Sequence, residues 1–178
     1  MFIIACLGNP GSAYGRNRHN VGFLAGEYLA RTNGIRLDKK SFSSITGKGR
    51  FAGSDVLIML PQTYMNASGD AVQAAMSFYR LGGESLVVLH DEVELPFGEV
   101  RVKFGGGHKG HNGVRSIIQQ TGSADFHRIR IGVGRPPREG MSVADHALSN
   151  FSAEELAALE GRYPAIAAMV DDVLNSAS

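Results

Sequence analysis

The stretch FIIACLGNPG, at residues 2–11, starts as a continuous apolar run and ends in residues that form turns. The apolar run predicts a buried strand, and the Gly-Asn-Pro-Gly sequence after it predicts a loop at the end of that strand. Asn20 can then cap a helix, whose apolar residues repeat at the helical period as far as a stop at Asn33 and Gly34. The chain is therefore predicted to open with a strand, a loop and an amphipathic helix.

The same alternation continues along the chain. DVLIML at 55–60 and SLVVLHDE at 85–92 predict two more buried strands, and a helix that Asn66 or Ser68 can cap lies between them. We predict two half-exposed strands, at 99–104 and 127–134, and a short helix between them at 112–122. Two tail helices are predicted, one on either side of Pro164. Strands that alternate with helices predict an α/β fold with a twisted, mixed, mainly parallel sheet flanked by helices.

Composition excludes several classes of protein. A chain of 178 residues, 43% of them hydrophobic, has the size of one domain, so we expect a single domain over residues 1–178 with a helical C-terminal part from about residue 141. No apolar run reaches the ~18 residues that a membrane span needs, and the start lacks the basic region of a secretory signal. The single cysteine, Cys6, lies in the first apolar run, so we expect a buried thiol without a catalytic role, in a cytoplasmic protein.

The net charge of +1 hides two segments of opposite sign. Residues 98–138 contain eight basic and two acidic residues, whereas residues 139–178 contain seven acidic residues and one arginine. A basic cluster is typical of a surface that meets phosphates. The alternative is a charged surface strip that pairs with the acidic tail.

A histidine and an aspartate are the first candidates for chemistry. The loops after strands 2–8 and 85–92 follow carboxyl ends of strands, where α/β sheets bind ligands, so they can share one crevice. Asp91 there could orient His19, which precedes the first helix, for taking a proton from water. The alternatives are a surface histidine and an aspartate that caps a turn. Because no G-x-S-x-G or H-E-x-x-H motif occurs, histidine-activated water is the simplest hydrolytic chemistry.

Polar loops leave more alternatives open. Asn66 at a helix start could stabilise an oxyanion or merely cap the helix, and Asn9 and Asn112 are equally ambiguous because asparagine is common in turns. GGGHKGHNG at 105–113 could be a metal site, a phosphate cradle or a flexible loop. Its H-x-x-H pattern lacks an accompanying cysteine or carboxylate, so metal binding is disfavoured.

The combination of CLGNPGSAYGRNRHNVGF, LPQTYMNASGDAV, LHDEVELPFGEVRVKFGGGHKGHNGVRSI and FHRIRIGVGRP, in this order, resembles the bacterial-type peptidyl-tRNA hydrolases. The resemblance covers residues 2 to about 138. It implies an enzyme that cleaves the ester between a peptide and tRNA, so that tRNA from prematurely released peptidyl-tRNA is recycled. It also implies a monomeric cytoplasmic protein that binds tRNA but needs neither a metal nor an organic cofactor.

The resemblance also assigns roles to residues. It implies that His19 is the catalytic base and Asp91 its partner. The positions that it implies for contacts with peptide, terminal adenosine or tRNA phosphate are Asn9, Tyr14, Tyr64, Met65, Asn66, Lys103, His111, Asn112 and Arg130. Asn17, Lys109 and the loop at 135–141 depart from the family's pattern. The competing hypotheses are a non-enzymatic RNA-binding module of the same family, of the intron-splicing type, and a small-molecule hydrolase on the same sheet.

Overall fold

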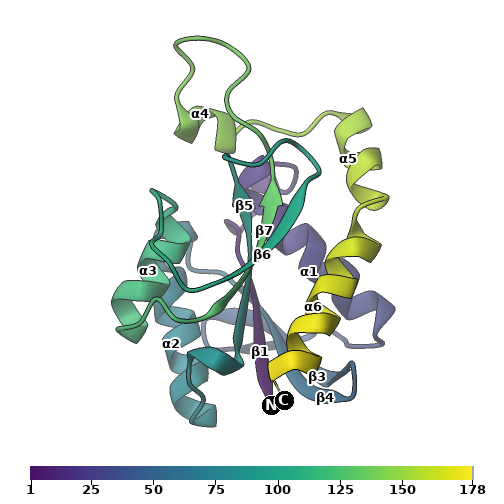
Figure 1. Cartoon of the computed structure of the whole chain (residues 1–178), viewed down its shortest axis with the longest axis vertical. Coiled ribbons are helices and arrows are strands. Elements are labelled where there is room, and N and C mark those ends of the chain that lie inside the picture. Colours follow the sequence, from purple (N-terminus) through teal and green to yellow (C-terminus); the bar gives the residue numbers. More distant parts are fainter. Residues whose placement is uncertain (178) are drawn as a thin grey trace.

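A computed structural model describes residues 1–177 (Figure 1). One seven-stranded sheet forms its centre. The strands are β1 (Phe2–Cys6), β2 (Lys39–Ser41), β3 (Ser44–Phe51), β4 (Ser54–Pro61), β5 (Leu86–Glu92), β6 (Val100–Phe104) and β7 (His127–Gly132). The helices are α1 (Val21–Thr32), α2 (Ser68–Tyr79), α3 (Asn112–Thr121), α4 (Val143–Ala147), α5 (Ala153–Glu160) and α6 (Tyr163–Ala177).

The strand order is β2-β3-β4-β1-β5-β7-β6. The four central strands, β4, β1, β5 and β7, are parallel, and antiparallel pairing adds β3 and β2 at one edge and β6 at the other. Every residue of β1 is buried, as its continuous apolar run requires of a central parallel strand. The predicted α/β fold with a mixed, mainly parallel sheet is therefore confirmed.

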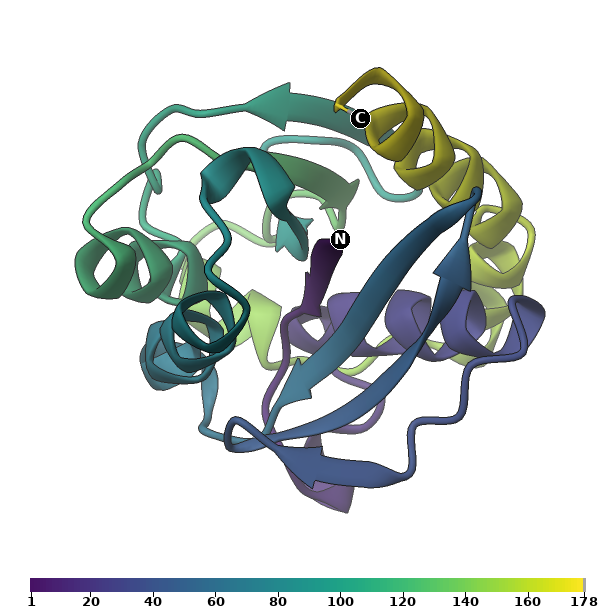
Figure 2. The same ribbon diagram turned by 90° about the horizontal axis from the view of Figure 1, so that it is seen from below.

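Side chains of β1 alternate between two hydrophobic clusters, one on each face of the sheet. Ile4 and Cys6 belong to the cluster with α1 and α6, whereas Ile3 and Ala5 belong to the cluster with α2 and α3. Both views show these helix pairs on opposite faces of the sheet (Figures 1 and 2). Because β1 is buried on both faces, the positions of its ends are fixed, and so is the position of the polar loop that follows it.

The start of α1 lies unusually close to the sheet. A Cβ atom on Gly22 would lie 2.6 Å from the carbonyl oxygens of both Leu7 and Leu89, which no side chain tolerates. Glycine at this position lets the helix start approach the carboxyl ends of β1 and β5. His19, three residues earlier in the chain, is thereby brought against the end of β5.

Several predicted details were wrong or missing. β2 and β3 were not predicted, because SITGKGRF carries two glycines and little apolar alternation. Gly47 and Gly49 are needed there, since Cβ atoms would lie 2.2 Å from the Arg36 oxygen and 2.5 Å from the Ile35 side chain. The tail helices do separate near Pro164, although this residue lies in the first turn of α6, where proline is tolerated.

The predicted helix caps also need correction. The side chain of Asn20 does not cap α1, and neither Asn66 nor Ser68 caps α2. The amide of Asn20 instead binds the backbone of Asn9, and the Ser68 hydroxyl donates to the Met65 carbonyl. Among residues 1–177, no helix is long and apolar enough to span a membrane.

Candidate active site

A cleft of about 570 Å³ opens at the carboxyl ends of β1, β4 and β5. Eight of the residues that the sequence singled out line it: Asn9, His19, Tyr64, Met65, Asn66, Asp91, His111 and Asn112. They come from loops that are far apart in the sequence but meet at the carboxyl ends of the parallel strands, which is where α/β sheets bind ligands. The predicted crevice is thus present, and Tyr14, Lys103 and Arg130 lie outside its lining.

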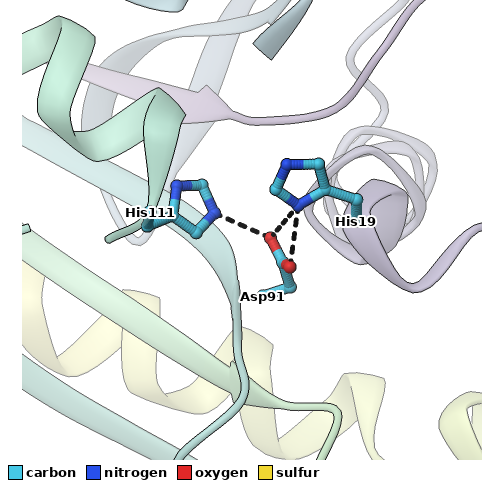
Figure 3. Close-up of side chains that lie close together, drawn as sticks. All are labelled: His19, Asp91 and His111. Atoms are coloured by element: carbon cyan, nitrogen blue, oxygen red, sulfur yellow. Dashed lines mark hydrogen bonds and ion pairs between the residues drawn. The ribbon is translucent and has the colours of Figure 1, made fainter. Parts of the chain in front are cut away.

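Asp91 is the centre of the hydrogen bonding in this cleft (Figure 3). It ends β5 with only 3% of its side chain exposed. The Nδ1 atom of His19 lies 2.9 and 2.8 Å from the two carboxylate oxygens, and Nε2 of His111 lies 2.7 Å from Oδ1. We call His19, Asp91 and His111 the Asp91 centre.

The tautomer of His111 is fixed by the start of α3. Its Nδ1 atom accepts hydrogen bonds from the backbone N–H groups of Gly113 and Val114, at 3.1 and 3.2 Å, so His111 is the N-cap of this helix. A nitrogen that accepts two hydrogen bonds carries no proton. The proton of the neutral ring is therefore on Nε2, which donates it to Asp91.

The tautomer of His19 follows from the same carboxylate. An ionised carboxylate only accepts hydrogen bonds, so Nδ1 of His19 donates to Asp91. In the neutral ring this leaves the lone pair on Nε2, which lies on the side of the ring away from Asp91 (Figure 3). The arrangement presents a histidine base in a cleft, with its other nitrogen held by an aspartate.

The protonation states agree with this geometry. Burial alone would raise the pKa of Asp91, but the charges and hydrogen bonds of His19 and His111 hold it well below its ordinary value. Burial lowers the pKa of His19, yet the Asp91 carboxylate outweighs burial and raises it above the ordinary value of 6.5. Burial and the neighbouring His111 lower the pKa of His90, next to Asp91, to about 4. At neutral pH, Asp91 is thus ionised and His90 neutral.

Ligand atoms of the Asp91 centre lie within 4.8 Å of one another, which is a spacing that a metal ion could use. The fixed tautomer of His111 opposes such binding, because Nε2 carries a proton and offers no lone pair. Moving that proton to Nδ1 would direct it at the N–H groups of Gly113 and Val114. The donor set therefore fits hydrogen bonding to Asp91 better than metal coordination.

Asn9 is fixed at three points. The Asn20 side chain accepts from the backbone N–H of Asn9 and donates to its carbonyl oxygen, both at 2.9 Å. The Oδ1 atom of Asn9 accepts the backbone N–H of Met65 at 2.7 Å. Because its oxygen is already bonded, Asn9 offers the cleft an amide N–H donor. Sequence reasoning missed this role of Asn20, since the pattern predicted a helix cap.

The other predicted cleft residues lie at the two helix starts. Asn66 is exposed in the 3-10 turn Met65–Ala67 before α2, and Asn112 is exposed in the first turn of α3. Tyr64 before them has a left-handed backbone, with φ of 62°, and its ring meets that of Tyr14 edge-on at 6.3 Å. Tyr14 therefore supports Tyr64 rather than lining the cleft itself.

A basic group lies beside the cleft. Lys103, Lys109 and Arg130, which we call the basic rim, line a second, smaller cavity with His90 and Glu92. The Nε atom of Arg130 donates to Glu92 at 2.9 Å, so its two terminal nitrogens are the part of the guanidinium left for a ligand. Lys109 is exposed and has a φ of 47°, a backbone conformation that glycine adopts with less strain.

Two further parts of the cleft were not predicted by residue, although the resemblance implied that part of the tail from Met141 on flanks the cleft. Arg128 is buried and donates to the carbonyl oxygens of Gly107 and Ala124, at 2.8 and 3.0 Å, which anchors the glycine-rich loop. The short helix α4 adds an apolar wall formed by Val143, Ala144, Ala147 and Leu148. Its start carries a recognisable signal, Ser142 three residues before Asp145, whose backbone N–H the serine accepts at 3.0 Å.

Comparison with known proteins decides the family. The sequence profile described as peptidyl-tRNA hydrolase matches residues 3–178. The chain belongs to the peptidyl-tRNA hydrolase family. The peptidyl-tRNA hydrolase of Geotalea daltonii is 46% identical over 157 residues, which are 88% of this chain and 81% of that protein. That of Geobacter metallireducens is 46% identical over 172 residues, 97% of this chain and 86% of that protein.

Solved structures agree with the sequence comparison. The crystal structure of peptidyl-tRNA hydrolase from Acinetobacter baumannii superposes with a TM-score of 0.88 and 37% identity, over 99% of this chain and 94% of that one. The predicted membership of the peptidyl-tRNA hydrolase family, and hence of a family of hydrolases, is confirmed. The non-enzymatic RNA-binding module is not favoured.

Proposed function

We propose that this chain hydrolyses the ester bond that joins a peptide to the terminal ribose of tRNA, with His19 as the general base. Nε2 of His19 takes a proton from water while the oxygen of that water attacks the ester carbonyl. Collapse of the tetrahedral intermediate breaks the bond to the ribose oxygen, which takes up a proton from the imidazolium. The products are a peptide acid and tRNA, and the base is regenerated.

The observation that carries this proposal is the hydrogen bond from His19 Nδ1 to Asp91. It assigns the lone pair to Nε2 and stabilises the imidazolium that forms when water is deprotonated. The side-chain amides of Asn66 and Asn112 lie at two helix starts, where an N–H donor and the helix dipole favour negative charge on the oxygen of the intermediate. Asn9 offers an N–H donor to the peptide end of the substrate.

We propose that the cleft and the smaller cavity beside it divide the substrate between them. The apolar wall on α4 and the ring of Tyr64, which Tyr14 supports, suit the peptide and the terminal adenosine. Lys103 and Arg130 suit the phosphates that follow in the tRNA. Following the family resemblance, we further propose that the protein works as a cytoplasmic monomer without a metal or organic cofactor.

Replacing the base tests the proposal most directly. A positioned general base contributes about 10²- to 10⁴-fold in rate, so His19→Ala should lose that much kcat on peptidyl-tRNA and keep nearly normal affinity for tRNA. His127→Ala is the matched control, because His127 lies at the amino end of β7, whereas the cleft lies at the carboxyl ends of the parallel strands. Normal ester cleavage by the His19→Ala protein would exclude His19 as the base. A simple N-blocked amino-acid ester, assayed in parallel, measures what the tRNA contributes.

A further inference from the structure

The residues just before His19 are bonded to a segment that is far away in the sequence. The backbone N–H of Arg18 donates to the Ser149 carbonyl at 3.1 Å, and the N–H of Phe151 donates to the Arg16 carbonyl at 2.8 Å. Between these bonds, Asn17 and Asn150 form an isolated antiparallel bridge. Residues 16–18 and 149–151 thus pair like two short strands, and we call this pairing the clasp.

Side chains reinforce the clasp. Asn17 is 3% exposed, and its amide donates to the side-chain oxygen of Asn150 at 2.6 Å. One terminal nitrogen of Arg18 donates to the Ser149 hydroxyl and the Asn150 carbonyl, at 2.8 and 2.7 Å. The other binds both carboxylate oxygens of Glu155, at 2.9 and 3.1 Å. Asn150 thus accepts the N–H of the Asn17 amide, whereas the Oδ1 atom of Asn17 is buried without a partner among the described residues.

The acceptor for Arg18 is itself fixed. Glu155 completes a capping box at the start of α5, in which its carboxylate accepts the Ser152 N–H at 2.9 Å and its own N–H donates to the Ser152 hydroxyl at 3.1 Å. A carboxylate with a restrained rotamer makes a better anchor than a mobile surface acid. The guanidinium of Arg18 also lies over the ring of Phe151, 5.3 Å from its centre.

The clasp lies directly behind the base. His19 belongs to the 3-10 turn Arg18–Asn20, in which Arg18 is held by the clasp and Asn20 by the backbone of Asn9. With both neighbours fixed, the backbone of His19 has little freedom to move away from Asp91. The same segment follows α4, so the clasp also links the apolar wall of the cleft to the base.

We infer that Arg18, Asn17, Asn150 and Glu155 are positioning residues, which keep His19 in place through the backbone that precedes it. None of them lines the cleft, so they act through His19. The physical reason is the steep dependence of proton transfer on geometry, since a misplacement of about 1 Å can cost about 10²-fold in rate. This inference rests on the proposed role of His19 and assigns a function to the acidic C-terminal part of the chain.

Glu155→Gln tests the inference, because glutamine keeps an oxygen for the Ser152 N–H and removes the charge that binds Arg18. We expect kcat to fall about 10-fold with KM changed less than twofold, since the substrate does not touch Glu155. The matched control is Asp55→Asn in the exposed pair of Arg50 and Asp55, whose side chains are 66% and 70% exposed. It should leave kcat unchanged. Arg18→Lys keeps the charge without the planar fork and should give an intermediate kcat.

A second readout does not depend on turnover. The Nδ1 proton of His19 in its bond to Asp91 should give a far-downfield proton resonance that is absent in His19→Ala. We expect Glu155→Gln to broaden or shift this resonance and Asp55→Asn to leave it unchanged. A wild-type kcat with an unchanged resonance in Glu155→Gln, or a loss confined to KM, would overturn the inference. Full activity of His19→Ala would instead overturn the proposed function, while the resonance would still report on the clasp.

Discussion

The Asp91 centre lines the cleft and the basic rim lines the smaller cavity beside it, and the two are built in different ways. In the Asp91 centre every side chain is at most 14% exposed, and one carboxylate fixes the orientation of two imidazoles. In the basic rim, Lys109 is exposed. Of the three rim residues, only Arg130 forms an ion pair within the described part of the chain, and its partner is Glu92. Chemistry at one bond needs fixed geometry, whereas attraction of a polyanion needs mainly charge.

The largest effect of this difference is expected at Asp91. In Asp91→Asn, the amide N–H₂ can donate to Nδ1 of His19, which moves the ring proton to Nε2 and removes the base. We expect kcat on peptidyl-tRNA to fall about 10²-fold or more, whereas the affinity for tRNA changes little. Single-turnover kinetics together with tRNA binding measurements separate the two quantities. A loss of affinity with an unchanged kcat would show that Asp91 belongs functionally to the rim.

Asp91→Asn should also change the pH dependence of the reaction. The base acts when neutral, so activity is lost as pH falls through the pKa of His19, which the Asp91 carboxylate raises above its ordinary value. Without that carboxylate the burial remains and lowers the pKa of His19. The acidic limb of the pH profile should therefore move to lower pH, although the rate on the plateau is smaller. A limb that stays in place would mean that another group titrates there.

A smaller effect is expected at His111, which both caps α3 and binds Asp91. Asparagine can still cap the helix but is too short to reach Asp91, so His111→Asn separates the two roles. We expect about a 10-fold loss in kcat with a nearly normal melting temperature, since a hydrogen bond to a charged group contributes about 1.5 kcal/mol or more. His111→Ala should also lower the free energy of unfolding by about 1 kcal/mol, which is the usual cost of removing a helix cap. Equal activity of the Asn variant and the unmutated protein would make His111 purely structural.

Some parts of the site and the fold could be predicted from the sequence and others could not. The meeting of His19 and Asp91 was predictable, because both lie beside carboxyl ends of buried strands, and the continuous apolar runs identify such strands. The cap on α3 by His111 was not, because histidine is a rare cap and the glycine-rich pattern around it left a metal site, a phosphate cradle and a flexible loop open. The edge strand β2 and its neighbour β3 were also missed, since they bury too little apolar surface to show a periodic pattern.

Contacts of long range were the least predictable. Arg18 and Glu155 are separated by 137 positions, and no local pattern pairs an arginine with one acid among the seven of the tail. The charge count left open whether the acidic tail pairs with the basic segment 98–138. In the structure, the tail's Glu155 binds Arg18 instead, while Arg130 is paired with Glu92, so the basic rim is not neutralised by it. Tertiary packing, rather than local sequence preference, determines which acid pairs with which arginine.

The smallest effect is expected in the basic rim. Lys103→Gln removes one positive charge without changing the Asp91 centre, so kcat should stay constant and KM for peptidyl-tRNA should rise about two- to fivefold at low salt, because an exposed ion pair contributes up to about 1 kcal/mol. Each phosphate contact releases counterions, so the slope of log affinity against log salt should become shallower by about 1. Lys40→Gln is the matched control, since Lys40 is an exposed lysine on β2 at the other edge of the sheet. A short N-blocked aminoacyl ester of adenosine has no phosphates, so Lys103→Gln should hydrolyse it at the normal rate. An unchanged salt slope in Lys103→Gln would remove this lysine from the tRNA contacts, and a slower reaction on the short ester would assign it to the chemistry.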